Sequence, residues 1–146
     1  MSEYRAFEFV VPGIPIPQGS KNPWGGEANA NLKPWRATVA EFANTSLPPD
    51  HGPLVTAVEV EVSFVFPRPK AHYRTGKNAE LLKDSAPYWH TGKPDLDKLQ
   101  RAIGDALSGV LLRDDSQIAS WMVEKRYVDL LEDEGPHARV WIQELR

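Results

Sequence analysis

The chain has 146 residues, of which 41% are hydrophobic and 25% charged, and its formal net charge is −3. These values are typical of a soluble globular protein of one domain, so we expect a single domain over residues 1–146. The absence of cysteine excludes disulfide bonds and thiolate metal sites, and the negative net charge argues against a general nucleic-acid-binding protein, whose surface is normally basic.

The first half of the chain predicts a strand, a helix and a second strand. The stretch "RAFEFVV" alternates apolar and polar residues as a strand does, and a loop rich in proline, glycine and asparagine follows it. In "KPWRATVAEFANTS", Trp35, Val39 and Ala43 recur at helical spacing, and Pro48 ends the helix. The stretch "VTAVEVEVSFVF" alternates most clearly, which indicates a sheet with one packed and one solvent-exposed face.

The segment at about 67–93 has no regular period and predicts a long loop or arm. Its only acids are Glu80 and Asp84, whereas its basic residues are Arg68, Lys70, Arg74, Lys77, Lys83 and Lys93. A run of charge is most often a solvated surface loop, and this stays the simplest interpretation. A basic segment next to an acidic cluster is also what a metal-dependent enzyme needs to act on a polyanion.

The second half predicts another helix and two strands. The helix begins after Asp95 and ends near Gly109, with a buried stripe of leucine and isoleucine, while Asp97, Arg101 and Asp105 share its polar face. "QIASWMVEKRYV" and "ARVWIQEL" read as strands joined by a turn. The order β-α-β-α-β-β predicts an α+β fold, a two-layer sandwich of a mixed sheet with its helices on one face.

Aspartates gather around this second helix. Two of them have sufficient structural explanations, since Asp95 can cap the helix and Asp97 can interact with the helix dipole. However, "RDDSQI" places Asp114 and Asp115 before a strand that can return along the helix, so the second pair can lie beside the first. Carboxylates gathered in one place repel each other without a cation, and oxygen ligands favour Mg²⁺ or Mn²⁺. The four histidines are isolated and show no zinc spacing, so we expect them at the surface.

The stretch "HTGKPDLDKLQRAIGDALSGVLLRDDSQI" resembles the signature of the RusA family of Holliday junction resolvases. That signature has K-P-D-x-D-N, a lysine four residues after the second aspartate, D-A-L, and then D-D-x-Q with a hydrophobic residue. The detailed match runs from Lys93 to Ile118, and the early "GIPIPQGS" is similar to the family's G-x-P-x-P segment. The resemblance implies a small, Mg²⁺-dependent, homodimeric endonuclease that nicks two opposing strands of a four-way DNA junction.

Carried over by position, the resemblance implies that Asp95, Asp97 and Asp115 are the catalytic metal ligands. Asp114 is their acidic neighbour and a further candidate ligand. Lys98 stands where the family has asparagine, and Arg101 stands where it has its functional lysine. Either residue can take the basic catalytic role, although arginine is permanently charged and cannot donate a proton as lysine does.

Two alternatives to this function remain open on the sequence. One is a metal-dependent phosphoesterase or nuclease acting on nucleotides or on other branched DNA, and the other is a non-catalytic DNA-binding protein. Bound DNA is expected along the six basic residues of the arm, where Tyr73, Tyr88 and Trp89 can stack on open bases. The alternative location for DNA lies across Lys125, Arg126 and the loop around Lys21. The candidate contacts for a homodimer are Trp121 and Trp141, although packing in the core explains these two tryptophans equally well.

The sequence also predicts where the protein works. No apolar stretch approaches the length of a membrane-spanning helix, and "MSEYRAFEFVV" has no basic region and no long apolar run. We therefore expect no signal peptide, no membrane contact and a cytoplasmic location.

Overall fold

The structure, a computed structural model, describes residues 4–19, 29–49, 51–132 and 134–146. Within these residues it has one sheet of four strands and two α-helices in the order β-α-β-α-β-β, so the predicted α+β class is confirmed. The strands are β1 (Ala6–Pro12), β2 (Val58–Phe66), β3 (Ile118–Tyr127) and β4 (His137–Glu144), and the helices are α1 (Leu32–Ser46) and α2 (Leu96–Leu107). Among the described residues, no helix combines the length and the apolar composition that crossing a membrane requires.

The sheet is mixed, with the strand order β1-β4-β2-β3. β4 pairs antiparallel with both β1 and β2, whereas β2 and β3 run parallel. A parallel pair needs a long connection, which the segment with α2 supplies as it carries the chain from the end of β2 back to the start of β3. The start of α2 and the turn before β3 therefore belong to one crossover, and both bear the predicted catalytic aspartates.

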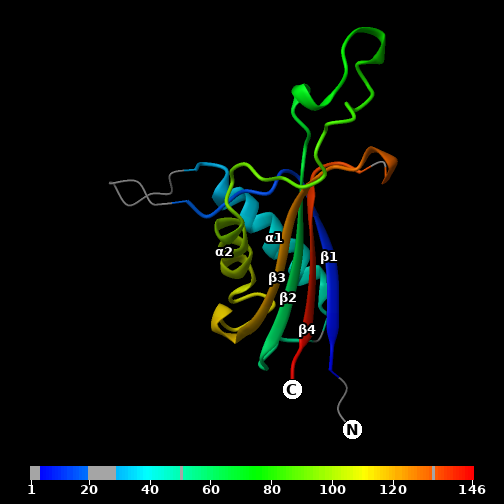
Figure 1. The fold of residues 1–146 in the computed structure, drawn as a ribbon. Helices are drawn as coiled ribbons and strands as arrows, with labels where there is room; N and C mark the ends of the chain where they lie inside the picture. Colours follow the sequence, from blue (N-terminus) through cyan, green and yellow to red (C-terminus); the bar gives the residue numbers. More distant parts are fainter. Residues whose placement is uncertain (1–3, 20–28, 50, 133) are drawn as a thin grey trace.

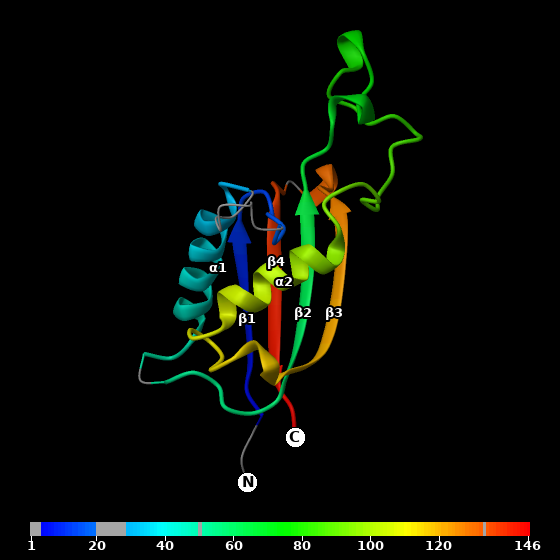
Figure 2. The same ribbon diagram turned by 90° about the vertical axis from the view of Figure 1, so that its left-hand side faces the viewer.

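Both helices pack on the same face of the sheet, which gives the predicted two-layer sandwich (Figure 1, Figure 2). The core between the layers is built from the residues that set the helical periods in the sequence: Trp35, Val39, Ala43, Leu99, Ile103 and Leu107. The alternating apolar residues of β2 meet them from the sheet. After α2, Gly109 has a φ of +81°, the left-handed conformation that glycine adopts most readily, and the chain turns there.

Residues 67–93 form an arm that projects beyond the end of β2 (Figure 1, Figure 2). Two short 3₁₀ turns and an antiparallel bridge give its outer part local structure. Its base is fixed by Arg68, whose Nε donates to the carbonyl of Val128 at 2.9 Å and whose Nη1 donates to the carbonyl of Pro87 at 2.7 Å. The basic segment is therefore anchored at the end of the sheet from which the chain enters α2.

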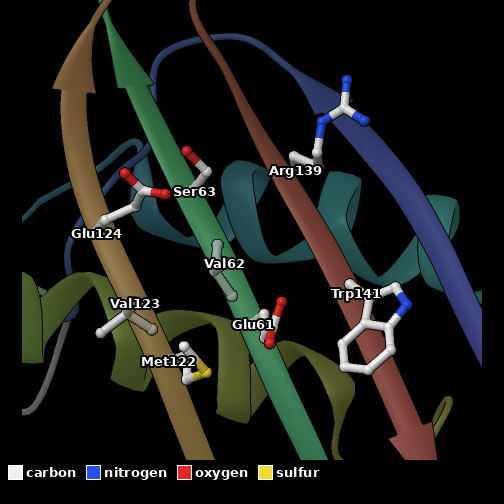
Figure 3. Close-up of a pocket in the computed structure, with 8 residues that line it drawn as sticks. All are labelled: Glu61, Val62, Ser63, Met122, Val123, Glu124, Arg139 and Trp141. Carbon is white, nitrogen blue, oxygen red and sulfur yellow. The ribbon is translucent and has the colours of Figure 1, made fainter.

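The opposite face of the sheet carries the polar residues of the strand alternation, some of which Figure 3 shows. Glu61 of β2 and Glu124 of β3 stand there beside Arg139 and Trp141 of β4. Arg139 is already paired with Glu8 of β1, with 2.7 Å between Nη1 and Oε1. Acids outnumber bases in this group, so the middle of this face is negatively charged.

Candidate active site

In the described part of the chain, two cavities border the first half of α2. The smaller has a volume of about 260 Å³ and is lined by Asp97, Gln100, Arg101, Gly104, Asp115, Ile118 and Trp121. The larger has a volume of about 730 Å³ and is lined by Asp95 at the N-cap of α2, by Lys98 of α2, by His90 and Lys93 of the arm, and by residues of the proline-rich N-terminal segment. Asp97, Arg101 and Asp115 thus share one cavity, whereas Asp95 and Lys98 line the other.

The turn Asp114–Gln117 holds Asp115 in place. The Asp114 carboxylate accepts a hydrogen bond from the backbone N–H of Ser116 at 3.0 Å, and Oε1 of Gln117 accepts one from the backbone N–H of Asp114 at 3.0 Å. Nε2 of Gln117 also donates to two backbone carbonyl groups just before β2, at 3.0 and 2.9 Å. These bonds fix the turn to the start of the central strand, so Asp115 is presented from a rigid part of the fold.

Gly104 leaves room for Asp115 beside α2. A methyl group on Gly104 would lie 3.6 Å from Cζ2 of Trp121 and 3.7 Å from Cβ of Asp115, which are ordinary van der Waals distances. A longer side chain at this position would enter the cavity that Asp97 and Asp115 share. Asp97 lies about two helical turns before Gly104 on the same helix and lines the same cavity.

Backbone contacts shape the larger cavity around Asp95. Nζ of Lys125 donates to the carbonyl groups of Gly92 and Pro94, the latter at 2.7 Å, and so fixes the chain immediately before Asp95. On the opposite side, the backbone N–H of Gln18 donates to the carbonyl of Lys98 at 2.9 Å and ties the proline-rich segment to α2. Both walls are therefore held by long-range hydrogen bonds.

The three aspartates implied as metal ligands differ from most other aspartates in their contacts. Asp95 stands at the N-cap of α2, but its side chain makes no capping hydrogen bond. Within the described ranges, the carboxylates of Asp95, Asp97 and Asp115 make no hydrogen bond and no ion pair. The carboxylates that do have such partners are those of Asp84, Asp105, Asp114 and Asp129. The side chain of Asp95 therefore does not cap the helix, and all three carboxylates are available to a cation.

The donor atoms of the smaller cavity suit Mg²⁺. The described residues contain no group of three or more His, Cys, Asp or Glu side chains close enough together to hold a metal ion. Mg²⁺ usually needs no such group, because one or two carboxylates bind it while water and substrate phosphates complete its octahedron. Asp97 and Asp115 offer two carboxylates at one cavity, and Asp95 stands two residues before the first of them.

Asp105 and Asp114 have structural partners. The Asp105 carboxylate lies 3.8 Å from Nη1 of Arg36 on α1, and the same guanidinium donates to Oε1 of Gln18 at 3.1 Å. The hydrogen bonds from Ser116 hold the pKa of the Asp114 carboxyl below its usual value. The role of Asp114 as a metal ligand stays a prediction, and Asp115 is the member of the pair that lines the cavity with Asp97.

The six basic residues predicted to bind DNA fall into two groups. Arg68 and Arg74 hold the arm together, since Arg68 fixes its base and Arg74 donates to the carbonyl of Leu82 at 3.1 Å and pairs with Asp84 at 3.1 Å. The other group consists of exposed side chains that have no hydrogen-bond or ion-pair partner among the described residues: Lys70, Lys77, Lys83 and Lys93. The lysines are thus the side chains free to contact phosphate.

The alternative location for DNA receives less support. Lys125 is bonded to backbone next to Asp95, and Arg126 is paired with Glu134 at 2.9 Å. Lys21 lies outside the described residues. Of the aromatic residues in the arm, Tyr88 and Trp89 are 47% and 53% exposed and are in edge-to-face contact, with 4.8 Å between their ring centroids.

The two tryptophans considered for a dimer lie on different faces of the sheet. Trp121 is on the helix side, packs against the core and lines the smaller cavity. Trp141 is on the opposite face, beside Glu61 (Figure 3). Of these two tryptophans, only Trp141 is therefore placed where a second subunit can reach it without disturbing the aspartates predicted to be catalytic.

Sequence reasoning did not single out Gln117, Gly104 or His90. The D-D-x-Q spacing contained a signal for Gln117, since an amide three residues after an N-cap aspartate can close a capping box. His90 is not the exposed surface residue that the sequence predicted, because its ring packs against both Phe66 and Tyr127, with centroid distances of 4.7 and 4.8 Å. Burial first, and then the charge of Lys125, lower the pKa of His90 below its usual value.

Comparison with known proteins identifies the family of this chain. The family model described as "Endodeoxyribonuclease RusA" matches residues 15–143, which include both cavities' aspartates. The chain is also similar to a protein of Bacillus subtilis (strain 168) named "Uncharacterized protein YqaN", with 29% identity over 147 residues that span 94% of this chain and 96% of that protein. Because the family model covers most of the chain and the whole crossover that carries the aspartates, the protein belongs to the RusA family of endodeoxyribonucleases.

Proposed function

We propose that this protein is a structure-specific endonuclease that resolves four-way (Holliday) DNA junctions by paired symmetric nicks, with Mg²⁺ as its cofactor and Mn²⁺ as a substitute. In this proposal it acts in the cytoplasm, in DNA recombination and repair. One observation carries the proposal: the carboxylates of Asp95, Asp97 and Asp115 are without partners in the described part of the chain and border α2 at the foot of a basic arm. The family membership supplies the reaction class, hydrolysis of a DNA phosphodiester.

The charges of the two sides of the molecule support one placement of the DNA. The open face of the sheet bears Glu61 and Glu124, and its Arg139 is already paired, so it repels phosphate. The arm offers lysines without partners and leads directly into Asp95. DNA gripped by the arm is therefore delivered to α2 and its carboxylates.

The residues of the smaller cavity divide the chemistry between them. Asp97 and Asp115 would hold the ion, with Asp95 contributing from the adjoining turn. Mg²⁺ held there would supply a water of lowered pKa and would neutralise charge on the leaving oxygen. Arg101 lines the same cavity and holds a non-bridging oxygen of the phosphate as its charge increases in the transition state.

The two basic candidates have different places in this mechanism. Arg101 shares the cavity of Asp97 and Asp115, whereas Lys98 lines the cavity of Asp95. Because arginine keeps its proton, Arg101 stabilises charge and does not transfer a proton. Lys98 holds the neighbouring phosphate of the same strand.

A homodimer follows from the proposed reaction, since two opposing strands need two sites related by a two-fold axis. Sedimentation at micromolar concentration is expected to give twice the mass of the chain. A monomer that still makes paired cuts would contradict this part of the proposal.

The proposed function is tested with a four-way junction labelled in turn on each strand. Cleavage is expected in Mg²⁺, at symmetric positions in two opposing strands, and none in EDTA. Equal cleavage of flaps, three-way junctions or free nucleotides would favour a broader phosphoesterase instead. Junction binding without any divalent-metal-dependent cleavage would favour a non-catalytic DNA-binding protein.

A further inference from the structure

The larger cavity has walls of mixed chemistry. Its apolar side comes from the segment Ile14–Pro17 and from Phe66 at the end of β2. Lys93 and Lys98 bring positive charge to it, and Asp95 belongs to the same wall as Lys98. A ligand of this cavity therefore combines apolar surface with negative charge close by.

The cavity is present before any ligand binds. Its N-terminal wall is bonded to α2 through Gln18 and the carbonyl of Lys98, and the opposite wall is fixed by Lys125. The backbone N–H of His90 also donates to the carbonyl of Lys125 at 3.2 Å, which holds the arm against β3 at this point. Little ordering is thus needed on binding, which favours affinity.

His90 contributes a polar atom next to the apolar side of this cavity. Its ring lies against Phe66 and Tyr127, and it lines the cavity. Nδ1 of His90 is buried and has no hydrogen-bond partner among the described residues. A buried polar atom without a partner is unfavourable, so a ligand with a complementary group at its edge gains from meeting it.

We propose that this cavity binds a nucleobase that has left the base stack of the bound DNA. A nucleobase has apolar faces for Ile14 and Phe66, a polar edge for His90, and a phosphate on either side for the two lysines. Because Asp95 lines the cavity, the base belongs to a nucleotide next to the phosphate that is cut. This inference rests on the proposed function and deepens it, since it makes the cavity the place where the nucleotide sequence at the cut is selected.

The test measures base unstacking in EDTA, so that it does not depend on cleavage. Junctions carry 2-aminopurine, which brightens when it leaves the stack, at each nucleotide around the crossover in turn. Wild-type protein is expected to brighten one position per strand. Ile14 is 51% exposed, so Ile14→Glu leaves the fold intact while placing a carboxylate in the cavity. This variant is expected to reduce the occupancy of the unstacked state at least about fivefold, or about 1 kcal/mol, because a carboxylate replaces an apolar contact in which each buried methylene contributes about 0.8 kcal/mol.

Val55→Glu is the matched control, because Val55 is 59% exposed and does not line the cavity. It is expected to brighten the same position as wild type. The proposal is overturned if no position brightens, or if Ile14→Glu brightens the junction as wild type does, even when the junction is cleaved in Mg²⁺. Conversely, brightening that depends on Ile14 without any cleavage in Mg²⁺ would support the base pocket and refute the nuclease assignment.

Discussion

Replacing Lys77 and Lys83 by glutamine tests whether the arm holds DNA. Both side chains are exposed and have no hydrogen-bond or ion-pair partner among the described residues, so their loss leaves the structure of the arm intact. Each phosphate contact contributes about 0.9 to the slope of log affinity against log salt, because binding releases condensed counterions. The double variant is therefore expected to flatten that slope by about 1.8, and each single variant by about 0.9.

The assay is the dissociation constant of a four-way junction, measured by fluorescence anisotropy in EDTA over a series of salt concentrations. Lys33→Gln is the control, since Lys33 is an exposed lysine of α1 outside the arm and is expected to leave the slope unchanged. The cleavage rate at saturating DNA should also stay unchanged in the double variant, because the aspartates are untouched. An unchanged salt slope would show that the arm is a solvated loop and that the DNA lies elsewhere.

Arg74 was part of the same predicted group, and its replacement is a less selective test. With three lost phosphate contacts, charge alone predicts a slope change of two to three units for Arg74, Lys77 and Lys83 together. However, the Arg74 guanidinium also bonds the carbonyl of Leu82 and the carboxylate of Asp84, so its loss loosens the arm as well. The double lysine variant separates the charge effect from this structural one.

Three further predictions concern the residues around α2. Gly104→Ala should keep cleavage and raise the free energy of unfolding by up to about 1 kcal/mol, because alanine is the better helix former and its methyl group fits. Gly104→Leu should stop cleavage, because its side chain fills the cavity. Thermal melts and cleavage rates distinguish the two variants. Gln117→Ala should lower the free energy of unfolding by about 1–3 kcal/mol in a denaturant titration, since it leaves part-buried carbonyl groups without a partner, and a loss below 0.5 kcal/mol, about the smallest net value of one hydrogen bond, would contradict its role as an anchor. Asp105→Asn should retain cleavage because Asp105 pairs with α1 and does not line the cavity, and a loss as complete as that of Asp97→Asn would move the metal along the helix.

Most of the fold could be predicted because each element has a clear local pattern. The alternation of "VEVEVSFVF" fixes which face of β2 is buried, and the stripe Leu99, Ile103 and Leu107 fixes how α2 lies on it. The pairing of the strands was harder to predict, since neither pattern indicates that β2 and β3 are parallel or that β4 lies between β1 and β2. These pairings depend on contacts between distant parts of the chain, which no local period encodes.

For the candidate site, the sequence indicated candidate residues but not their geometry. The order of the elements indicated that Asp114 and Asp115 can lie beside Asp95 and Asp97. In the structure Asp97 and Asp115 line one cavity, while Asp95 lines another. Counting charge could not distinguish the arm's lysines from Arg68, which holds the base of the arm. Nor could it show that Lys125 bonds backbone 31 residues earlier in the chain, because only the folded structure brings these groups together.

Cleavage of a four-way junction in Mg²⁺, compared between the wild-type protein and Asp95→Asn, Asp97→Asn and Asp115→Asn, tests the central claim most directly. Asparagine keeps the shape of each side chain and removes the charge that a cation requires, so all three variants are expected to bind the junction as wild type does in EDTA and to cut neither strand. A wild-type rate in any one variant would remove that residue from the metal site. Cleavage by the wild-type protein that persists in EDTA would contradict metal-dependent hydrolysis at these aspartates altogether.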